Sequence, residues 1–224
     1  MLVSNNPVKL KELINRKKLL IFDFDGVLVD SVEVKTDAFA ELYKHYGEEI
    51  ENRVVEHHRN NGGMSRFDKI RYYHNEFLNK PISEKEISEL SAKFSKLVVN
   101  NVISAEEIKG ASAFLKRCIL SNKICAINSA TPEDEIIEIA KCRSLNKYFK
   151  NIYGSPTTKK QNLEKALKDC DISVDDAVFL GDAQSDFDAA LEVEMAFVGV
   201  GKQIIQILNA HENEFIGIED FQEA

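Results

Sequence analysis

The chain has 224 residues, of which 44% are hydrophobic and 29% charged, and its formal net charge is −8. This composition excludes a disordered, collagen-like or low-complexity chain, and the acidic balance argues against general binding to nucleic acids or membrane surfaces. No apolar run approaches the roughly 18 residues of a membrane span, and the basic N-terminal segment does not resemble a secretory signal. The cysteines are scattered, as in a reduced cytoplasmic chain. We therefore expect a cytoplasmic protein with one large domain, or one domain that carries an insertion.

Short apolar runs, each bounded by charged residues, Gly, Pro or Ser, predict buried strands. After the first run, they alternate with helical patterns at short intervals, which indicates a parallel sheet with helices on both faces. The predicted strands are Leu19–Phe24, Ile124–Asn128, Asn151–Tyr153, Ala177–Gly181 and Ala196–Val200. The helices predicted between and after the later strands are Glu133–Arg143 with Thr131 as its N-cap, Gln161–Lys168, Phe187–Glu192 and Gln203–Ala210.

About a hundred residues separate the first two predicted strands, and most of them show apolar residues at helical spacing. Helices are expected over Glu33–Tyr46, Phe67–Leu78 and Glu84–Val99. The predicted fold class is therefore α/β. A Rossmann-like parallel-sheet core is formed by residues 1–30 and 104–224, and a small α-helical cap domain, residues 31–103, is inserted after the first strand. The insert is closer to electrical neutrality than the core and holds most of the histidines, a composition that suits a lid over an anion.

Acidic residues stand at the ends of the first and fourth predicted strands: Asp23 and Asp25 at the first, Asp182 and Asp186 at the fourth. One aspartate after a strand is often a turn or cap residue. Two such clusters favour a site, because ligands of open parallel sheets bind at the carboxyl ends of the strands. Clustered carboxylates repel one another unless a cation holds them. Oxygen ligands favour a hard cation, and Mg²⁺ suits a site that also receives phosphate.

The segment from Asp23 to Ser31, DFDGVLVDS, resembles the first motif of the haloacid dehalogenase-like hydrolase superfamily. Three further motifs of that superfamily follow in order, each at a predicted strand end. They are Ser129 in INSATP, Lys159 after Gly154-Ser155-Pro156-Thr157-Thr158, and Gly181-Asp182-Ala183-Gln184-Ser185-Asp186. The resemblance covers the whole predicted core, and the insert lies where the superfamily has its helical cap.

This resemblance implies a Mg²⁺-dependent hydrolase that cleaves small phosphomonoesters through an aspartyl-phosphate. Asp23 would be the nucleophile that accepts the phosphoryl group. Asp25 would protonate the leaving alcohol and then take a proton from the attacking water. The implied ligands of Mg²⁺ are Asp23, the backbone carbonyl of Asp25, Asp182 and Asp186.

The resemblance also implies a group of residues that binds the phosphoryl oxygens: Ser129, its neighbour Ala130, and Lys159. Each has an alternative interpretation. Ser129 could cap the helix that begins near Pro132, and Lys159 could be a solvated lysine. Lys160 is a rival for the phosphate-binding role, but Lys159 fits the superfamily's spacing after the Gly-Ser-Pro segment.

The acid at Asp25 favours phosphate-ester chemistry, because dehalogenases and phosphonoacetaldehyde hydrolases of the superfamily lack it. In the insert, the segment from Gly63 to Ile70 resembles the substrate loop of β-phosphoglucomutases, so Gly63 and Arg66 are candidate substrate contacts. A sugar phosphomutase is therefore the alternative function. Against it, Lys35 stands where those mutases carry a histidine, and the second and third motifs are closer to the phosphoglycolate-phosphatase-like branch.

A binding or regulatory protein that keeps the fold without turnover is a different class of function. Such a protein would have lost Asp23 or Asp25, and both are present. The expected partner is a small phosphorylated metabolite, with neither a nucleic acid nor a membrane, and the expected cofactor is Mg²⁺.

Overall fold

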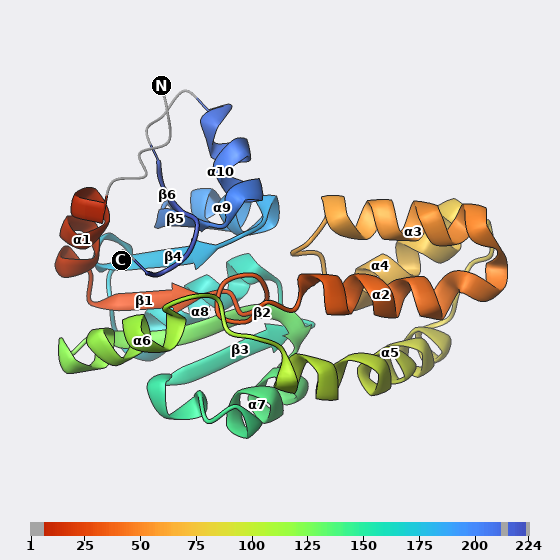
Figure 1. The fold of residues 1–224 in the computed structure, drawn as a ribbon, viewed down its shortest axis with the longest axis horizontal. Helices are drawn as coiled ribbons and strands as arrows, with labels where there is room; N and C mark the ends of the chain where they lie inside the picture. Colours follow the sequence, from red (N-terminus) through yellow and green to blue (C-terminus); the bar gives the residue numbers. More distant parts are fainter. Residues whose placement is uncertain (1–6, 212–214, 223–224) are drawn as a thin grey trace.

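The computed structural model describes residues 7–211 and 215–222, and a six-stranded parallel sheet lies at its centre (Figure 1). The strand order is β3-β2-β1-β4-β5-β6. All five predicted strands are found, and the α/β fold with a parallel sheet is confirmed. The strands are β1 (Leu19–Phe22), β2 (Ile124–Pro132), β3 (Asn151–Ser155), β4 (Ala177–Gly181), β5 (Ala196–Val200) and β6 (Ile216–Ile218).

Helices cover both faces of the sheet, because the strands bury apolar side chains on both sides. In β1, Leu20 and Phe22 face one set of helices, and Leu19 and Ile21 face the other. The first set is α1 (Pro7–Arg16), α6 (Ala111–Leu120) and α7 (Glu133–Cys142). The second set is α8 (Lys159–Cys170), α9 (Gln184–Glu192) and α10 (Lys202–Asn209). Short 3-10 turns, η3 (Asn146–Tyr148) and η4 (Val174–Asp176), precede β3 and β4.

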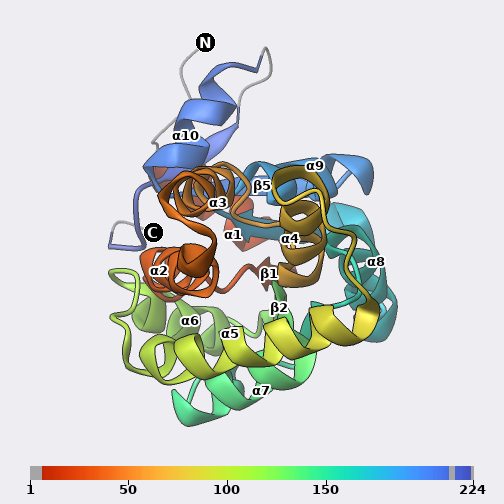
Figure 2. The ribbon, with the colours of Figure 1, turned by 90° about the vertical axis from the view of Figure 1, so that its right-hand side faces the viewer.

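The chain between β1 and α6 forms a helical insert that lies beyond the carboxyl ends of the strands (Figures 1 and 2). Its interior is aromatic: the ring of Phe39 lies 4.3 Å from that of Phe94 and 5.7 Å from that of Tyr73, between centroids. The insert therefore has a packed interior of its own. Its elements are α2 (Val32–Tyr43), η1 (Lys44–Tyr46), α3 (Glu48–Asn60), α4 (Arg66–Tyr72), the π-helical turn η2 (Tyr73–Phe77) and α5 (Glu84–Ser104).

Two segments, residues 26–31 and 105–110, connect the insert to the sheet, and we call them the connector pair. They are hydrogen-bonded to each other. The Asp30 amide donates to the Glu106 carbonyl at 2.9 Å, and the Ile108 amide donates to the Leu28 carbonyl at 3.1 Å. The chain therefore enters and leaves the insert at neighbouring points, close to the end of β1.

The structure corrects one detail of the predicted helices and adds several elements. The N-cap of α7 is Pro132 rather than Thr131, because β2 continues to Pro132. The hydroxyl of Thr131 instead donates to Asp25 at 3.3 Å. Helices α1, α3 and α6 and strand β6 were not predicted from the sequence.

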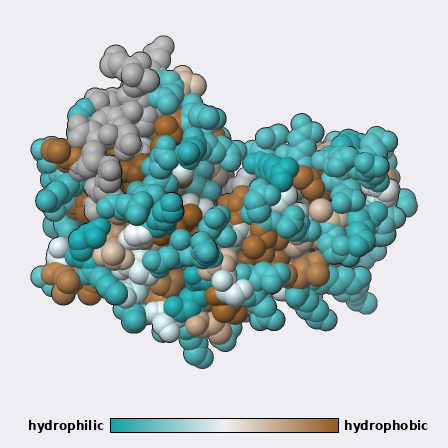
Figure 3. All heavy atoms as spheres, viewed as in Figure 1, coloured by the Kyte–Doolittle hydropathy of each residue, from teal (hydrophilic) through white to brown (hydrophobic). Residues whose placement is uncertain are grey.

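The face of the molecule in Figure 3 is mainly hydrophilic, and its outline narrows between the sheet-containing part and the insert. Within the described ranges, no helix is both long and apolar enough to cross a membrane.

Candidate active site

The end of β1 carries the first two acidic residues into the space between the sheet and the insert. The amide of Asp23 donates to the Leu180 carbonyl at 2.9 Å, so Asp23 still follows the pairing with β4. The chain then turns at Gly26, whose φ is +75°. A Cβ atom on Gly26 would collide with the carboxylate of Asp182. Glycine therefore serves twice here, because it accepts the left-handed conformation and leaves room for that carboxylate.

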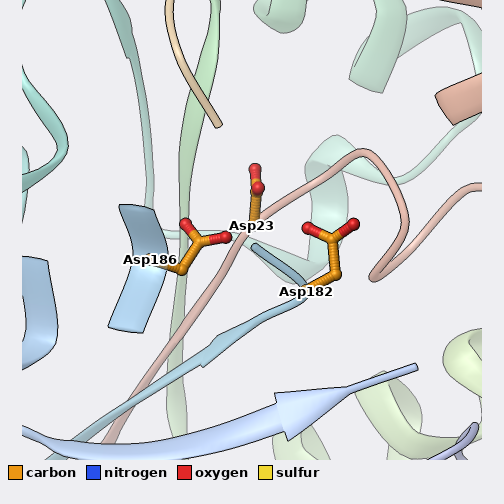
Figure 4. Close-up of side chains that lie close together, drawn as sticks. All are labelled: Asp23, Asp182 and Asp186. Atoms are coloured by element: carbon orange, nitrogen blue, oxygen red, sulfur yellow. The ribbon is translucent and has the colours of Figure 1, made fainter. Parts of the chain in front are cut away.

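Three of the predicted acidic side chains meet at this edge of the sheet. One carboxylate oxygen from each of Asp23, Asp182 and Asp186 lies within 4.8 Å of the others (Figure 4). Asp23 is 4% exposed and Asp186 is completely buried. Burial raises the pKa of Asp23 to about 7, although a lysine lies beside it. Burial and the charge of Asp23 also raise the pKa of Asp182 well above its usual value. The cluster therefore holds more negative charge than its surroundings neutralise.

Lys159 supplies the positive charge within this cluster. Its ammonium lies 2.8 Å from Oδ2 of Asp23 and also pairs with Oδ1 of Asp186. The residue is 9% exposed and begins α8, where the side-chain amide of Asn128 donates to its carbonyl at 2.9 Å. Burial opposes the charge, but the two carboxylates raise the pKa of Lys159 above its ordinary value. Lys160, the rival candidate, pairs with Glu192 at 3.3 Å on the surface, so the structure brings Lys159 and not Lys160 to Asp23.

The donor set fits a divalent cation. All three converging side chains offer oxygen atoms, which is the chemistry of Mg²⁺ and similar hard ions. One lysine faces three carboxylates, and burial first, with repulsion between the carboxylates in addition, raises the pKa values of Asp23 and Asp182. A divalent cation held by Asp23, Asp182 and Asp186 would remove that repulsion. The side chain of Asp25 is not part of this cluster, and its predicted contribution is a backbone carbonyl.

Asp25 is held instead by groups from both the sheet and the insert. Its Oδ1 accepts a hydrogen bond of 2.5 Å from Ser31, and its Oδ2 pairs with the ammonium of Lys35 on α2. Lys35 also donates to the hydroxyl of Thr131 at 2.7 Å. Burial alone would raise the pKa of Asp25, but the charge and hydrogen bond of Lys35 outweigh it and lower the pKa. Lys35 was not predicted as a site residue.

Ser129 and Ala130 lie at the end of β2, next to the acidic cluster. Ser129 is 1% exposed, and its hydroxyl accepts from the Thr131 amide at 3.1 Å. Ser129, Ala130 and Lys159 line a depression of about 390 Å³ that is bordered by α9 and the insert. The structure therefore brings the predicted phosphate-binding residues to one side of the cluster.

A second, smaller cavity of about 50 Å³ lies directly between the insert and the acidic residues. The core lines it with Asp23, Asp25, Ala130, Thr131 and Asp182. The insert contributes four cationic or imidazole groups, Lys35, His58, Arg66 and Lys69. Of these, only Arg66 was predicted as a substrate contact from the sequence. Met64 and Ala130 border both this cavity and the neighbouring depression.

The two candidate residues of the cap loop lie against the core. Gly63 sits over Lys159 and Ser185: a Cβ atom on Gly63 would lie 3.1 Å from the Lys159 ammonium nitrogen and would collide with the Ser185 hydroxyl. Arg66 is 4% exposed, and both terminal nitrogens of its guanidinium bind Glu135 on α7, at 2.5 and 2.9 Å. It also donates to Ser95 at 2.6 Å. Arg66 thus reaches the cavity while it joins the insert to the core.

The chain belongs to the haloacid dehalogenase-like hydrolase family, whose sequence model matches residues 20–200. This membership confirms the resemblance seen in the motifs and supports an enzyme. Among curated proteins, no sequence matches the chain.

Solved structures with the same fold include both phosphatases and mutases. A β-phosphoglucomutase from Clostridium difficile has 19% identity and a TM-score of 0.74, over 92% of each chain. A predicted phosphatase from Clostridium acetobutylicum has 20% identity and a TM-score of 0.71, over 90% of this chain and 93% of that one. A predicted phosphoglycolate phosphatase from Haemophilus somnus 129pt has 18% identity and a TM-score of 0.69, over 92% and 95%. At these identities the likeness shows the fold alone.

Proposed function

We propose that this protein is a Mg²⁺-dependent phosphatase that hydrolyses a small phosphorylated metabolite. The observation that carries the proposal is the convergence of Asp23, Asp182 and Asp186 around one point, with Lys159 against Asp23. A nucleophilic carboxylate beside a cation-binding cluster is what attack on a phosphate ester needs, because the ester and the carboxylate repel each other. Bound Mg²⁺ would supply the charge that lets them approach.

In this proposal the residues of the site divide the reaction between them. Asp23 attacks phosphorus and forms an aspartyl-phosphate, while the leaving alcohol takes a proton from Asp25. Water then attacks the phosphorus, Asp25 accepts its proton, and the bond to Asp23 breaks to release phosphate. Ser129, the backbone of Ala130 and Lys159 bind the non-bridging oxygens, on which negative charge must be stabilised during transfer.

The insert, residues 31–103, acts in this proposal as a cap that excludes bulk water from a labile acyl phosphate. Its position over the strand ends and the contact of Gly63 with Lys159 and Ser185 support that role. Gly63 and Arg66 remain proposed substrate contacts. The guanidinium of Arg66 keeps further N–H groups beyond those that bind Glu135 and Ser95.

The second candidate function is a β-phosphoglucomutase-like phosphomutase. It is favoured by the cap-loop resemblance around Gly63 and Arg66 and by the presence of a β-phosphoglucomutase among the proteins with this fold. The contact between Lys35 and Asp25 weighs against it, because a lysine replaces the histidine of those mutases at the acid-base group.

The first prediction tests the nucleophile. We expect purified protein to release inorganic phosphate from a panel of small phosphomonoesters only when Mg²⁺ is present. We expect Asp23→Asn to abolish this release while the circular dichroism spectrum stays unchanged, because the amide cannot form the aspartyl-phosphate. Asp37→Asn, on the exposed side of α2, is the matched control and should keep full activity.

A folded Asp23→Asn variant with an undiminished rate would contradict the proposal. Conversion of one sugar phosphate into its isomer, without net release of phosphate, would favour the mutase.

A further inference from the structure

Two amide side chains, Asn128 of β2 and Asn162 of α8, form a buried hydrogen-bonded pair next to the start of α8. Asn128 is fully buried and Asn162 is 1% exposed. Nδ2 of Asn162 donates to Oδ1 of Asn128 at 3.1 Å, and Nδ2 of Asn128 donates to the backbone carbonyl of Lys159 at 2.9 Å. Among the described residues that line the small cavity and the neighbouring depression, neither asparagine is present. The pair therefore reaches the site through the backbone of Lys159.

The surroundings of Asn162 decide which way the amide of Asn128 faces. A side-chain amide donates from its nitrogen and accepts at its oxygen. Nδ2 of Asn162 also donates to the carbonyls of Gly154 and Thr157, at 3.2 and 3.5 Å, so this nitrogen lies among acceptors. Asn162 therefore presents a donor to Asn128. Asn128 must answer with its oxygen, which leaves its nitrogen for the Lys159 carbonyl.

The amide pair ties together two elements that carry proposed phosphate-binding residues. Asn128 directly precedes Ser129 in β2, and Lys159 is the first residue of α8. The ladder between β2 and β1 ends at Ile127, and the ladder between β2 and β3 changes register between Asn128 and Pro132. Strand pairing is therefore irregular where Ser129 lies, so side-chain hydrogen bonds carry more weight in fixing this segment against α8.

We propose that Asn128 and Asn162 are positioning residues, which hold Lys159 in register with Ser129 so that both close on the same phosphoryl group. This inference rests on the proposed function, in which Lys159 and Ser129 bind the phosphoryl oxygens. The two amides act through the backbone of Lys159, whose ammonium lies 2.8 Å from Oδ2 of Asp23. A displacement of about 1 Å, caused by a change away from the reacting atoms, can cost about 100-fold in rate.

The test begins with Asn128→Leu, Asn162→Leu and the double variant, at a temperature at which circular dichroism shows all of them folded. Each variant breaks the link to Lys159, so each should lower kcat about 10- to 100-fold. The loss should be similar for n-propyl phosphate and p-nitrophenyl phosphate, because both present the same phosphoryl group. If leucine disturbs the packing, Asn162→Ser gives the same test, since its hydroxyl is too short to reach Asn128.

Melting temperatures separate this role from a structural one. Each single leucine variant leaves a buried polar group of the other asparagine without its partner, whereas the double variant removes both polar groups. The double variant should therefore lose less stability than the two single variants added together, while its kcat stays as low as theirs. Recovery of kcat together with the melting temperature in the double variant would overturn the proposal.

Gln161→Ala is the matched control, because it loosens the same helical turn without touching the amide pair. Gln161 is exposed, and its Oε1 accepts from the Thr158 amide at 3.2 Å in the capping box of α8. This variant should melt lower than wild type and keep its kcat. A loss of kcat as large as that of Asn162→Leu would mean that any loosening of this helix end suffices, which overturns the proposal.

The Lys159→Met background tests whether the amides act through Lys159. In that background Asn162→Leu should change kcat/KM, and the affinity for inorganic phosphate, by no more than about 2-fold, because the group that it positions is gone. A cost as large as in the wild-type background would show that the asparagines act in another way and would overturn the proposal.

Calorimetry with inorganic phosphate and Mg²⁺ distinguishes failure of this inference from failure of the proposed function. Asn162→Leu should weaken phosphate binding about 10-fold, and Gln161→Ala should leave it unchanged. Phosphate binding that depends on Asn162, in a protein whose wild type hydrolyses no ester, would support the positioning role and remove the phosphatase. Hydrolysis by wild type and by the asparagine variants at equal rates would keep the phosphatase and remove the positioning role.

Discussion

Asp25 is held in a charge state that matters for each half of the proposed reaction. Its pair with Lys35 lowers its pKa and favours the carboxylate, which is the form that accepts a proton from water. Donation to a leaving alcohol needs the carboxylic acid instead. Movement of Lys35 away from Asp25 when the substrate binds would raise this pKa and allow both steps. The role of Asp25 is therefore best tested by varying the leaving group.

We predict that Asp25→Asn slows the hydrolysis of alkyl phosphates far more than that of p-nitrophenyl phosphate. The nitrophenolate leaves without a proton, so loss of a general acid, normally worth about 10²- to 10⁴-fold, falls mainly on the alkyl ester. The measurement is kcat/KM for both substrates with each protein. Equal losses would mean that Asp25 serves only to hold the cation or the loop.

At the scale of elements, the ion pair of Arg66 and Glu135 connects α4 of the insert to α7 of the core. The guanidinium is 4% exposed and lies 4.6 Å above the centre of the Phe94 ring, so the pair is nearly dry. A buried pair of this kind is costly to break on one side only, because the remaining charge stays without a partner. Arg66 therefore both joins the insert to the core and lines the small cavity.

We predict that Arg66→Ala lowers kcat/KM for an anion-bearing ester about 10- to 150-fold and largely spares acetyl phosphate, which offers no second group to contact. Glu135→Gln, which keeps the arginine, is the comparison for the fastening role alone. If Arg66→Ala impairs both substrates equally, Arg66 acts by joining the insert to the core and not by contacting the substrate.

The elements that could be predicted from the sequence are those whose signal is local. The apolar runs predict the five longer strands directly. The aspartates that follow β1 and β4 could be placed at the carboxyl edge of the sheet, because a residue just after a strand lies at that edge. Strand β6 has three residues with a central glycine, too short for a pattern. Helix α3 buries only Val54 and His58, so its apolar periodicity is weak.

The residues that the insert contributes to the cavity lining could not be predicted from the sequence in the same way. In the sequence, Lys69 looks like an ordinary charged residue on the solvent side of a helix, and nothing near it indicates that it is buried. It meets His58 only because the fold of the insert brings this part of α4 next to α3. Lys35 likewise reaches Asp25 through the packing of α2 over the end of β1. Such contacts depend on tertiary structure, whereas Asp23, Asp182 and Lys159 depend on the strands that they follow.

At the scale of the whole molecule, the acidic cluster lowers the stability of the fold near neutral pH, because burial raises the pKa values of Asp23 and Asp182. We predict that Mg²⁺ at about 100 times its dissociation constant stabilises the protein by about 2.7 kcal/mol. For a chain of this length, that corresponds to a rise of about 5–10 °C in the melting temperature. Differential scanning fluorimetry with Mg²⁺ and with EDTA measures it.

Asp182→Asn should reduce this rise and should itself melt higher than wild type in EDTA, because it removes one of the repelling carboxylates. Asp188→Asn, outside the cluster, should keep the full response to Mg²⁺. An identical rise in wild type and Asp182→Asn would place the bound ion elsewhere on the protein.

The connector pair has a consequence for how such a protein can diversify. Because residues 26–31 and 105–110 are hydrogen-bonded side by side, the chain enters and leaves the insert at one place rather than at two distant points. A different helical module could be grafted there with no change to β1, β4 or the aspartates that they carry, provided that its two ends lie equally close. On the proposed function, the residues that act on phosphorus and those that contact the rest of the substrate would lie mostly in separate stretches of the chain, with the pair of Lys35 and Asp25 crossing between them.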